Sequence, residues 1–324
     1  MIFSEEPAPT IYEELLEMRK KIGTVDKTQW RDIVGASDSI FILKKKFDCV
    51  NRAFFKGVEL LELLEDIPQN ILCLCEAPGG FYEACKKLYP DANVFAHSLM
   101  RDDSIQFSNV VRNEDKLSVS FDGDITNVNV LDAIPDMVTN ISVVLADGGL
   151  QAKNLDTEEH ELLRLLSAQL YVAIRSVNPG GTIIVKMFEG NIQPTQQILE
   201  LVRISFRNMD IVKPISSKVA NSERYIIGYG KKNDIDESLE KLREIVTSEK
   251  DVTYLQDLGT NPLIPSMKDK LERMAMEQTK GIQHLLNFCT PGSDLKVLKT
   301  ESYRNIQDIS SILKKFGIQE KRRR

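Results

Sequence analysis

The sequence lacks the features of a membrane protein or a secreted protein. No run approaches the ~20 consecutive apolar residues that a transmembrane helix needs. The amino terminus carries Glu5 and Glu6 without an apolar segment, so we expect no secretory signal. The five cysteines are odd in number, and no pair of them has zinc-finger spacing with histidines. We therefore expect an intracellular protein, in the cytoplasm or nucleus, with reduced thiols and no metal site.

The sequence also lacks a strong charge of one sign, internal repeats and low-complexity segments. Its 42 Lys and Arg against 48 Asp and Glu leave a net charge of −6. That balance argues against a protein that coats nucleic acid non-specifically, although it permits a local basic groove. With 324 residues, of which 42% are apolar, the chain can form one large domain with appendages.

The most informative stretch is a turn rich in proline and glycine, Cys75-Glu76-Ala77-Pro78-Gly79-Gly80-Phe81. It follows the apolar run 71–74, which predicts a buried strand, and precedes 82–88, which predicts a helix. Such a unit holds adenosine-bearing cofactors at the carboxyl end of the strand. The stretch matches neither G-x-G-x-x-G nor the phosphate loop, so we expect a small cofactor rather than a pyrophosphate. An ordinary strand-to-helix turn is the alternative.

Strands and helices alternate through the middle of the chain. Short apolar segments predict strands at 71–74, 93–98, 117–121, 141–147, 182–188, 211–215 and 224–229. Helical patterns lie between them at 82–88, 127–137, 157–177 and 194–208. This order predicts an α/β fold, a Rossmann-like doubly wound sheet of seven mostly parallel strands in which the last strand is antiparallel.

Helical patterns continue at both ends of the chain. They cover 10–22, 39–65 as one or two helices, 236–247, 266–288 and 306–316, whereas 24–37 is loop-like with the lone Trp30. We expect an N-terminal helical extension at 1–45, a central α/β domain at 46–232 and a C-terminal helical region at 233–324. The basic tail 321–324 is either a solvated terminus or a contact for phosphate or nuclear import.

Four charged residues fall at element ends near the glycine turn. Lys56 precedes the first strand, Asp147 ends the fourth, Lys186 lies near the end of the fifth and Glu223 immediately precedes the last. Each alone could be an ordinary surface charge. Because strand ends at the carboxyl edge converge on the crevice of such a sheet, we expect the four to form one site.

These residues and the strings around them resemble the FtsJ-type ribose 2′-O-methyltransferases, and within them the eukaryotic and viral mRNA cap enzymes. The resemblance covers roughly residues 45–231. The matching strings are Asn51-Arg52-Ala53 with Lys56, Glu76-Ala77-Pro78-Gly79-Gly80-Phe81, Gly123-Asp124-Ile125-Thr126, Leu145-Ala146-Asp147-Gly148-Gly149, Gly180-Gly181-Thr182 with Lys186, and Lys213-Pro214-Ile215 with Asn221-Ser222-Glu223-Arg224-Tyr225.

The resemblance implies a catalytic tetrad of Lys56, Asp147, Lys186 and Glu223. This tetrad would methylate the 2′-hydroxyl of the cap-proximal nucleotide of mRNA with S-adenosyl-L-methionine. Capped mRNA and other capping enzymes are then the expected partners, and we expect no contact with a membrane. A virus-encoded source is compatible with the resemblance. Two alternatives stay open: the same chemistry on ribosomal or transfer RNA, and an inactive methyltransferase-like RNA-binding subunit of a capping complex. The sequence predicts no oligomeric state.

A lysine base would fit this chemistry if its pKa were shifted. A ribose hydroxyl reacts better once a base takes its proton, and free lysine titrates near about 10.4. We expect partial burial and the like charge of Lys56 to lower the pKa of Lys186. Asp147 and Glu223 would hold the two ammonium groups in place.

Further site residues follow from the resemblance. The cofactor should lie against Ala77, Pro78, Gly79, Gly80, Phe81, Asp124, Ile125 and Asp147, with Asp124 accepting from the adenine amino group. The alternative for Asp124 is capping of its own loop. Where many methyltransferases have an acid after the second strand, this chain has His97, a residue equally compatible with the core; Asp102 and Asp103 are weaker candidates.

RNA would cross the same edge of the sheet. Candidates for phosphate contact are Arg52, Ser216, Ser217, Lys218 and Ser222. Trp30, Phe54 or Phe55 could stack on a cationic methylated cap, although aromatic residues lie more often in the core.

Overall fold

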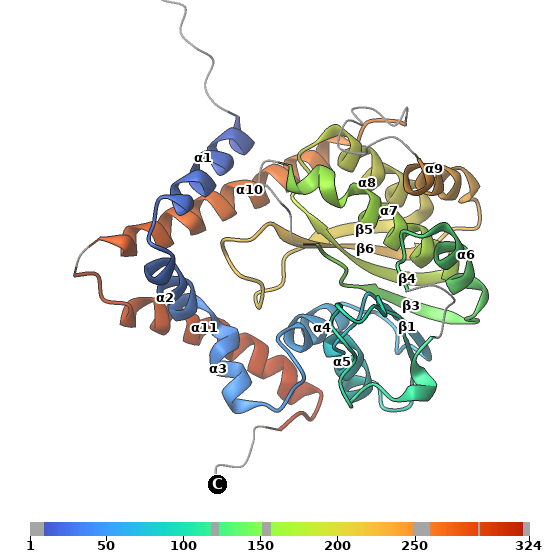
Figure 1. Cartoon of the computed structure of the whole chain (residues 1–324), viewed down its shortest axis with the longest axis horizontal. Helices are drawn as coiled ribbons and strands as arrows, with labels where there is room; N and C mark the ends of the chain where they lie inside the picture. The colour runs from blue at the N-terminus through green and yellow to red at the C-terminus, as the bar shows by residue number, and fades with distance from the viewer. Residues whose placement is uncertain (1–9, 118–122, 151–156, 249–259, 291, 320–324) are drawn as a thin grey trace, which may run out of the picture.

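A single mixed sheet forms the centre of the molecule (Figure 1). The computed structural model describes residues 10–117, 123–150, 157–248, 260–290 and 292–319. Within them the sheet has six strands in the order β2-β1-β3-β4-β6-β5. Their bounds are β1 Asn70–Leu74, β2 Asn93–Ala96, β3 Ile141–Ala146, β4 Val177–Phe188, β5 Phe206–Val212 and β6 Glu223–Lys231. The first four are mutually parallel, and β6 is antiparallel to both neighbours, as predicted for the last strand.

Two predicted strands differ from the sheet. The third, at 117–121, falls mostly outside the described residues, and just before it Lys116 forms an isolated parallel bridge with Ala96. The sixth, predicted at 211–215, is wrong in its start, since β5 begins at Phe206. The apolar pattern there resembles a continuing helix, but Phe206 is fully buried and pairs opposite Lys231 in the ladder. Tertiary pairing overrides the local pattern.

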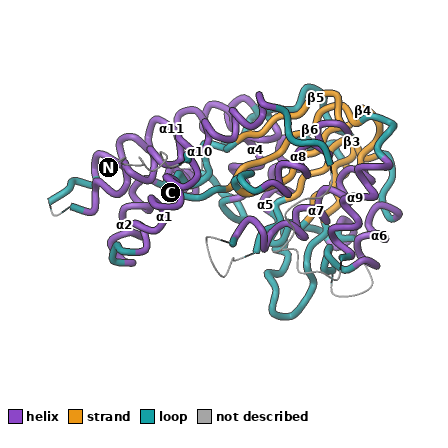
Figure 2. Tube along the Cα trace, turned by 90° about the horizontal axis from the view of Figure 1, so that it is seen from above, coloured by secondary structure: helices purple, strands orange, loops and turns teal. Residues whose placement is uncertain are grey.

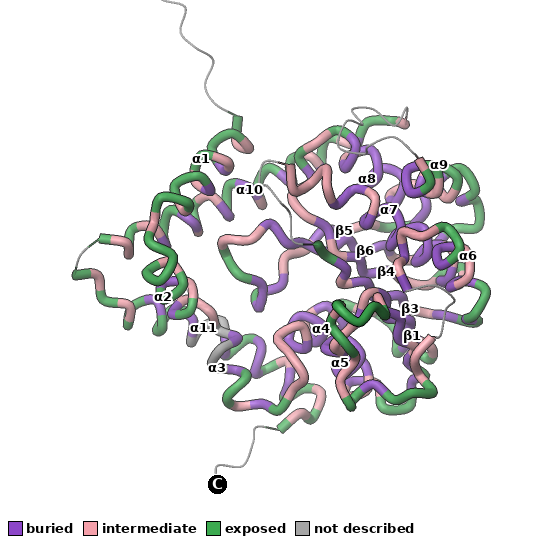
Figure 3. The backbone as a smooth tube through the Cα atoms, viewed as in Figure 1, coloured by how far each residue is buried: buried purple, intermediate pink, exposed green. Residues whose placement is uncertain are grey.

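Helices cover both faces of this sheet. Side chains alternate along each strand, so Leu72 and Leu74 of β1 pack on one face while Ile71 and Cys73 pack on the other. One face carries α4 Ala53–Leu61 and α5 Gly80–Leu88; the other carries α6 Val128–Asp136, α7 Glu158–Ser176, α8 Gln193–Ser205 and α9 Asp236–Thr247. Figure 3 shows the sheet as the most buried part of the fold. Burial on both faces explains the continuous apolar runs of the strands.

The remaining helices gather at one end of the molecule (Figure 2). They are α1 Ile11–Gly23, α2 Lys27–Ser37, α3 Ser39–Lys46, α10 Pro265–Leu286 and α11 Lys296–Lys315, with a short 3-10 turn at Asn287–Cys289. A second 3-10 turn, Asn113–Asp115, lies beside β2. Leu15 of α1 packs against Ala275 and Ile282 of α10. Ile33 of α2 packs against Leu298 of α11. Segments from the two ends of the chain therefore fold together beside the sheet.

The expectation of a loop at 24–37 is wrong, because α2 occupies most of it. Asp26 caps this helix, and its carboxylate accepts from the backbone N–H groups of Thr28 and Gln29. Ile33 and Ala36 are buried on its inner face. The stretch 39–65 forms two helices, α3 and α4.

Candidate active site

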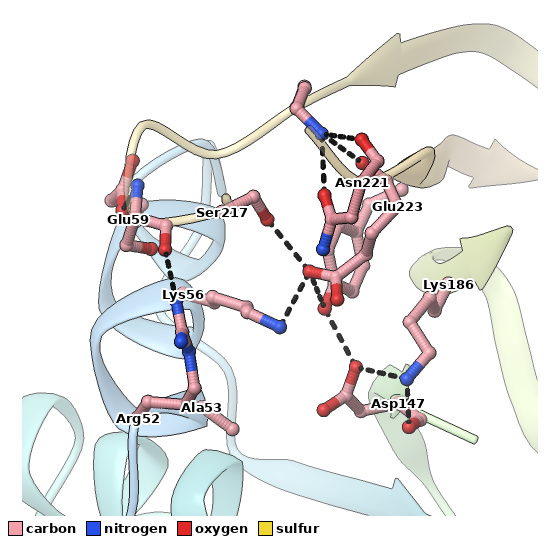
Figure 4. A network of polar contacts seen from close by, with 12 residues as sticks. Arg52, Ala53, Lys56, Glu59, Asp147, Lys186, Ser217, Asn221 and Glu223 are labelled. Atoms are coloured by element: carbon pink, nitrogen blue, oxygen red, sulfur yellow. Dashed lines mark hydrogen bonds and ion pairs between the residues drawn. The ribbon is translucent and has the colours of Figure 1, made fainter. Parts of the chain in front are cut away.

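The four predicted tetrad residues lie together as two adjacent ion pairs (Figure 4). Lys56 Nζ lies 2.6 Å from Glu223 Oε1. Lys186 Nζ lies 3.1 Å from Asp147 Oδ1 and donates to the backbone oxygen of Asp147 at 2.7 Å. All four side chains are less than a fifth exposed, so these charges are largely removed from water.

Strand register brings these side chains to one edge. Asp147 directly follows β3, whose Ala146 pairs with Val185, so it lies beside Lys186. On the antiparallel side, Glu223 at the start of β6 pairs with Phe188 at the end of β4. The start of an antiparallel strand and the end of a parallel one therefore meet at the same edge, as the sequence predicted.

A tyrosine links the two ion pairs. The hydroxyl of Tyr225 donates to Asp147 Oδ1 at 2.7 Å and lies 3.3 Å from Glu223 Oε1. Burial, together with Asp147 and Glu223, raises the pKa of Tyr225 well above its ordinary value. Sequence reasoning missed this residue. Its position two residues after Glu223, on the same face of the strand, was the signal that could have found it.

The charges of the site set the protonation of its members. Burial, the largest single influence, lowers the pKa of Lys186, but Asp147 and Glu223 outweigh it and raise that pKa above 10.5. The depressed pKa expected for Lys186 is therefore wrong for the free protein, because the charges of Asp147 and Glu223 outweigh the effect of burial. Burial would also raise the pKa of Glu223, yet Lys56 and Lys186 lower it to about 2.

Two further side chains hold Glu223 in place. Ser217 Oγ donates to Glu223 Oε1 at 2.7 Å. Lys213 Nζ donates to the backbone oxygen of Glu223 at 3.2 Å and to the backbone and side-chain oxygens of Asn221 at 2.6 and 2.8 Å. Burial lowers the pKa of Lys213 to about 7 despite the opposing charge of Glu223. The conformation around Glu223 is thus fixed from the segment that precedes β6.

The residues predicted to contact RNA mostly make internal contacts. Ser216, Ser217 and Ser222 are buried, and Ser222 donates to Glu189 at 3.3 Å. Arg52 pairs with Asp38 at 3.1 Å and donates to the backbone oxygen of Ser216 at 3.3 Å. Lys218 is exposed. Contact of this set with RNA stays a prediction, and Lys218 is its member most accessible to a phosphate.

A cavity of about 470 Å³ opens beside Asp147. Four of the predicted cofactor residues line it: Ala77, Asp124, Ile125 and Asp147. Its wall also includes Ser98, Leu99, Arg101, Asp103, Ser104, Ile105 and Leu165, of which only Asp103 was weighed as a contact from the sequence. Pro78, Gly79, Gly80 and Phe81 do not line it.

The glycine turn positions a helix as well as the cavity. Gly79 has a φ of +118°, a conformation that favours glycine. A Cβ on Gly80 would lie 2.1 Å from Asn51 Oδ1 and 2.9 Å from the backbone nitrogen of Phe54. Gly80 therefore allows α5 to approach the start of α4, the helix that carries Lys56.

Asp124 caps its own loop and also faces the cavity. Its Oδ1 accepts from the backbone nitrogen and hydroxyl of Thr126 at 3.0 and 2.7 Å. Its Oδ2 lies 2.8 Å from Arg101 Nη2. Asp124 therefore does cap its own loop, as the alternative expected. It also pairs with Arg101, a partner that the sequence did not identify.

Three aromatic or imidazole candidates belong to the core. Phe54 and Phe55 are 0% exposed and His97 is 1% exposed. Burial lowers the pKa of His97 to about 4, so it is neutral at pH 7. Phe54 and Phe55 are therefore excluded as stacking surfaces for a cap in this conformation. Trp30 is half-buried against the cluster around Ile33.

Other expectations concern thiols, metals and membranes. All five cysteines are free. Across the described ranges, no group of three or more His, Cys, Asp or Glu side chains could hold a metal ion. Among the helices of the same ranges, none combines the length and apolar character needed to cross a membrane.

The chain is similar to known methyltransferases. Residues 49–231 match a family model described as FtsJ-like methyltransferase. An African swine fever virus protein, named a probable methyltransferase, is 30% identical over 229 residues, which are 60% of this chain and 54% of that protein. The chain thus spans about half the length of this relative.

Two relatives carry more specific names. A cap-specific mRNA (nucleoside-2′-O-)-methyltransferase of Autographa californica nuclear polyhedrosis virus is 27% identical, covering 50% of this chain and 64% of that protein. The Mus musculus cap-specific mRNA (nucleoside-2′-O-)-methyltransferase 1 is 28% identical, covering 57% of this chain and 25% of that protein. A solved Plasmodium falciparum structure, described as a ribosomal RNA methyltransferase, aligns at 18% identity and a TM-score of 0.43 over 56% of this chain and 97% of its own.

Proposed function

Because the chain belongs to the FtsJ-like methyltransferase family, we propose that it methylates the 2′-hydroxyl of the cap-proximal nucleotide of mRNA, using S-adenosyl-L-methionine. The observation that carries this proposal is the pair of ion pairs, Lys56–Glu223 and Lys186–Asp147, of which Asp147 also lines the cavity. An inactive RNA-binding subunit would have no chemical need for four buried charges in this arrangement.

Lys186 is the proton acceptor in this proposal. Its ammonium group must first lose a proton to solvent, because Asp147 and Glu223 stabilise the charged form. The neutral amine can then accept the proton of the ribose hydroxyl. Lys56 neutralises part of the charge of Glu223, and Tyr225 keeps the two carboxylates at a fixed separation. Holding the hydroxyl in one orientation supplies a large share of the acceleration.

The residues of the cavity fit the proposed cofactor. Its volume lies within the range of sites that bury small ligands. Ile125 and Leu165 offer apolar surface for a flat base, while Asp124 and Asp147 offer carboxylates to donors and to positive charge. When bound, S-adenosylmethionine supplies an electrophilic methyl group.

The capped substrate is supported by the names of the baculovirus and mouse relatives and by Gly148-Gly149 after Asp147, a string typical of cap enzymes. Capped mRNA and other capping enzymes are therefore the proposed partners, inside the cell. Methylation of ribosomal or transfer RNA is the second candidate.

Three RNAs test the proposal with labelled cofactor: a capped oligonucleotide, the same oligonucleotide without a cap, and a transfer or ribosomal RNA. We expect label in the capped RNA alone. Equal labelling of the uncapped RNA, or labelling only of the structured RNAs, would support the second candidate. No labelling of any RNA, from folded protein that binds the cofactor, would support the inactive subunit.

Asp124→Ala is expected to weaken cofactor binding by about 1–3 kcal/mol, since a buried donor would lose its acceptor. Asp124→Asn keeps an acceptor oxygen and loses the charge facing Arg101, so we expect a smaller loss. Asp91→Ala, at an exposed position that does not line the cavity, is the matched control with affinity near that of the natural protein. Calorimetry measures all three. Unchanged affinity in Asp124→Ala would remove Asp124 from the site.

A further inference from the structure

The segment that precedes Glu223 is held against a helix outside the family-matched region. This segment, residues 213–222, joins β5 to β6 and is called the β5–β6 loop. Figure 1 shows it leaving the sheet in yellow toward α10. We propose that Gln278 and Gly281 of α10 are positioning residues that fix the β5–β6 loop and, through it, Glu223. The matched region ends at residue 231, so nothing in the family match assigns a role to α10.

Helix α10 contacts the loop at two neighbouring residues. Gln278 is 4% exposed and its Nε2 donates to the backbone oxygen of Ala220 at 3.2 Å. A Cβ on Gly281 would lie 2.2 Å from Cγ1 of Val219, so a larger residue at 281 would force Val219 to move. Ala220 also packs against the cluster that joins α1 to α10. The loop is thus seated on α10 by one hydrogen bond and one close contact.

The β5–β6 loop in turn fixes Glu223, a member of the tetrad. Ser217 lies two residues before Val219 and donates to Glu223 Oε1 at 2.7 Å. On its other side the loop is held by Glu59 of α4, whose carboxylate accepts from the backbone nitrogens of Ile215 and Ser216 at 2.7 and 3.0 Å. Glu59 lies one turn after Lys56 on the same helix. The loop is therefore clamped between α10 and the helix that carries Lys56.

Glycine at position 281 makes helix α10 less stable than alanine would, and the close approach of Val219 explains why glycine is there. Glycine in the interior of a helix is less favourable than alanine. Gly281 lies well inside α10, which runs from Pro265 to Leu286. Valine is branched at Cβ and has few rotamers, so Val219 cannot yield as a long flexible side chain would. A glycine at this position is the residue expected where a loop must lie close to a helix.

The first test compares two Gly→Ala variants, and its kinetic part rests on the proposed function. Gly281→Ala should favour the helix yet displace Val219, and we expect kcat to fall about tenfold with cofactor affinity unchanged, because small misplacements of reacting groups are costly. Gly35→Ala in α2 is the matched control, since a Cβ there meets nothing within 4 Å. We expect full activity from Gly35→Ala and no loss of melting temperature in either variant.

Rescue distinguishes positioning from a general structural effect. Without Cγ1, the nearest loop atom to the new Cβ is the Cβ of Val219, at an ordinary 3.7 Å. Gly281→Ala combined with Val219→Ala should therefore return kcat to the level of Val219→Ala alone. Full activity in Gly281→Ala, or a double variant as slow as Gly281→Ala, would overturn the proposal.

Hydrogen exchange tests the positioning role without measuring methyl transfer, so its result does not depend on whether the proposed function is correct. Hydrogen exchange of the amides of Ile215 and Ser216, which Glu59 holds, should be faster in Gly281→Ala and in Gln278→Met than in Gly35→Ala. Unchanged exchange in both variants would overturn the positioning role. Faster exchange in a protein that methylates no RNA would leave positioning standing and refute the proposed function.

Discussion

Replacing Lys186 by methionine is expected to abolish detectable methyl transfer while cofactor binding survives. General-base catalysis contributes about 10²–10⁴ in rate, and methionine cannot accept a proton. Lys186→Arg should be nearly as slow although it keeps the positive charge beside Asp147, because guanidinium does not give up its proton at working pH. Single-turnover transfer and calorimetry measure the two effects separately.

The arginine variant is the decisive control for this prediction. If Lys186 only held substrate by its charge, Lys186→Arg would retain substantial single-turnover activity in a folded protein. The pH profile adds a second check. Because the carboxylates raise the pKa of Lys186, the rate for the free protein should keep rising with pH beyond the ordinary pKa of lysine. A plateau near neutral pH would contradict Lys186 as the group that must lose a proton.

Replacing Lys56 by methionine is the second change with a large expected effect. Glu223 would lose its partner at 2.6 Å, and its charge would then act more fully on Lys186. The pKa of Lys186 should therefore rise further, and each unit of that rise cuts the neutral fraction about tenfold below the pKa. We expect transfer at neutral pH to fall and the pH profile to move upward. A profile that stays in place would show that Glu223 does not influence Lys186.

The same variant should lose less stability in acid than the natural protein does. In the natural protein the pKa of Glu223 is lowered from 4.5 to about 2, so its contribution to stability is present above about pH 4.5 and is lost as pH falls toward 2. Lys56→Met removes a major cause of that shift. Denaturant unfolding at pH 4.5 and at about pH 2 should show a smaller loss of stability in Lys56→Met than in the natural protein, on a lower overall stability. The exposed Lys44→Met is the control, expected to follow the natural protein.

The sequence located the tetrad because strand ends are visible as the ends of apolar runs. Asp147 and Lys186 end such runs, and parallel strands place their carboxyl ends at one edge. The direction of the shift in the pKa of Lys186 could not be predicted, since it depends on the balance between burial and the nearby carboxylates, and spacing along the chain does not give that balance. The buried partners Tyr225 and Lys213 were missed for the same reason.

Contacts between segments that are distant along the chain could not be predicted from the sequence either. The pairing of Phe206 with Lys231 starts β5 five residues before the predicted position, and nothing local in 206–210 marks it. The β5–β6 loop contains three serines that suggested phosphate contacts from the sequence. The internal contacts of Ser216 and Ser222 are to Glu59 and Glu189, which lie far away along the chain. Helix α10 lies outside every matching string, so its contact with Val219 had no signal in the sequence.

We propose above that this chain places a methyl group on one hydroxyl of a capped RNA. Mass spectrometry of a capped oligonucleotide, digested to nucleosides after incubation with the protein and S-adenosylmethionine, tests it most directly. We expect one added methyl, on the 2′-oxygen of the cap-proximal nucleotide, and none with Lys186→Met. A methyl on a base, on the cap guanine or on an internal ribose, or the same product from Lys186→Met, would contradict it.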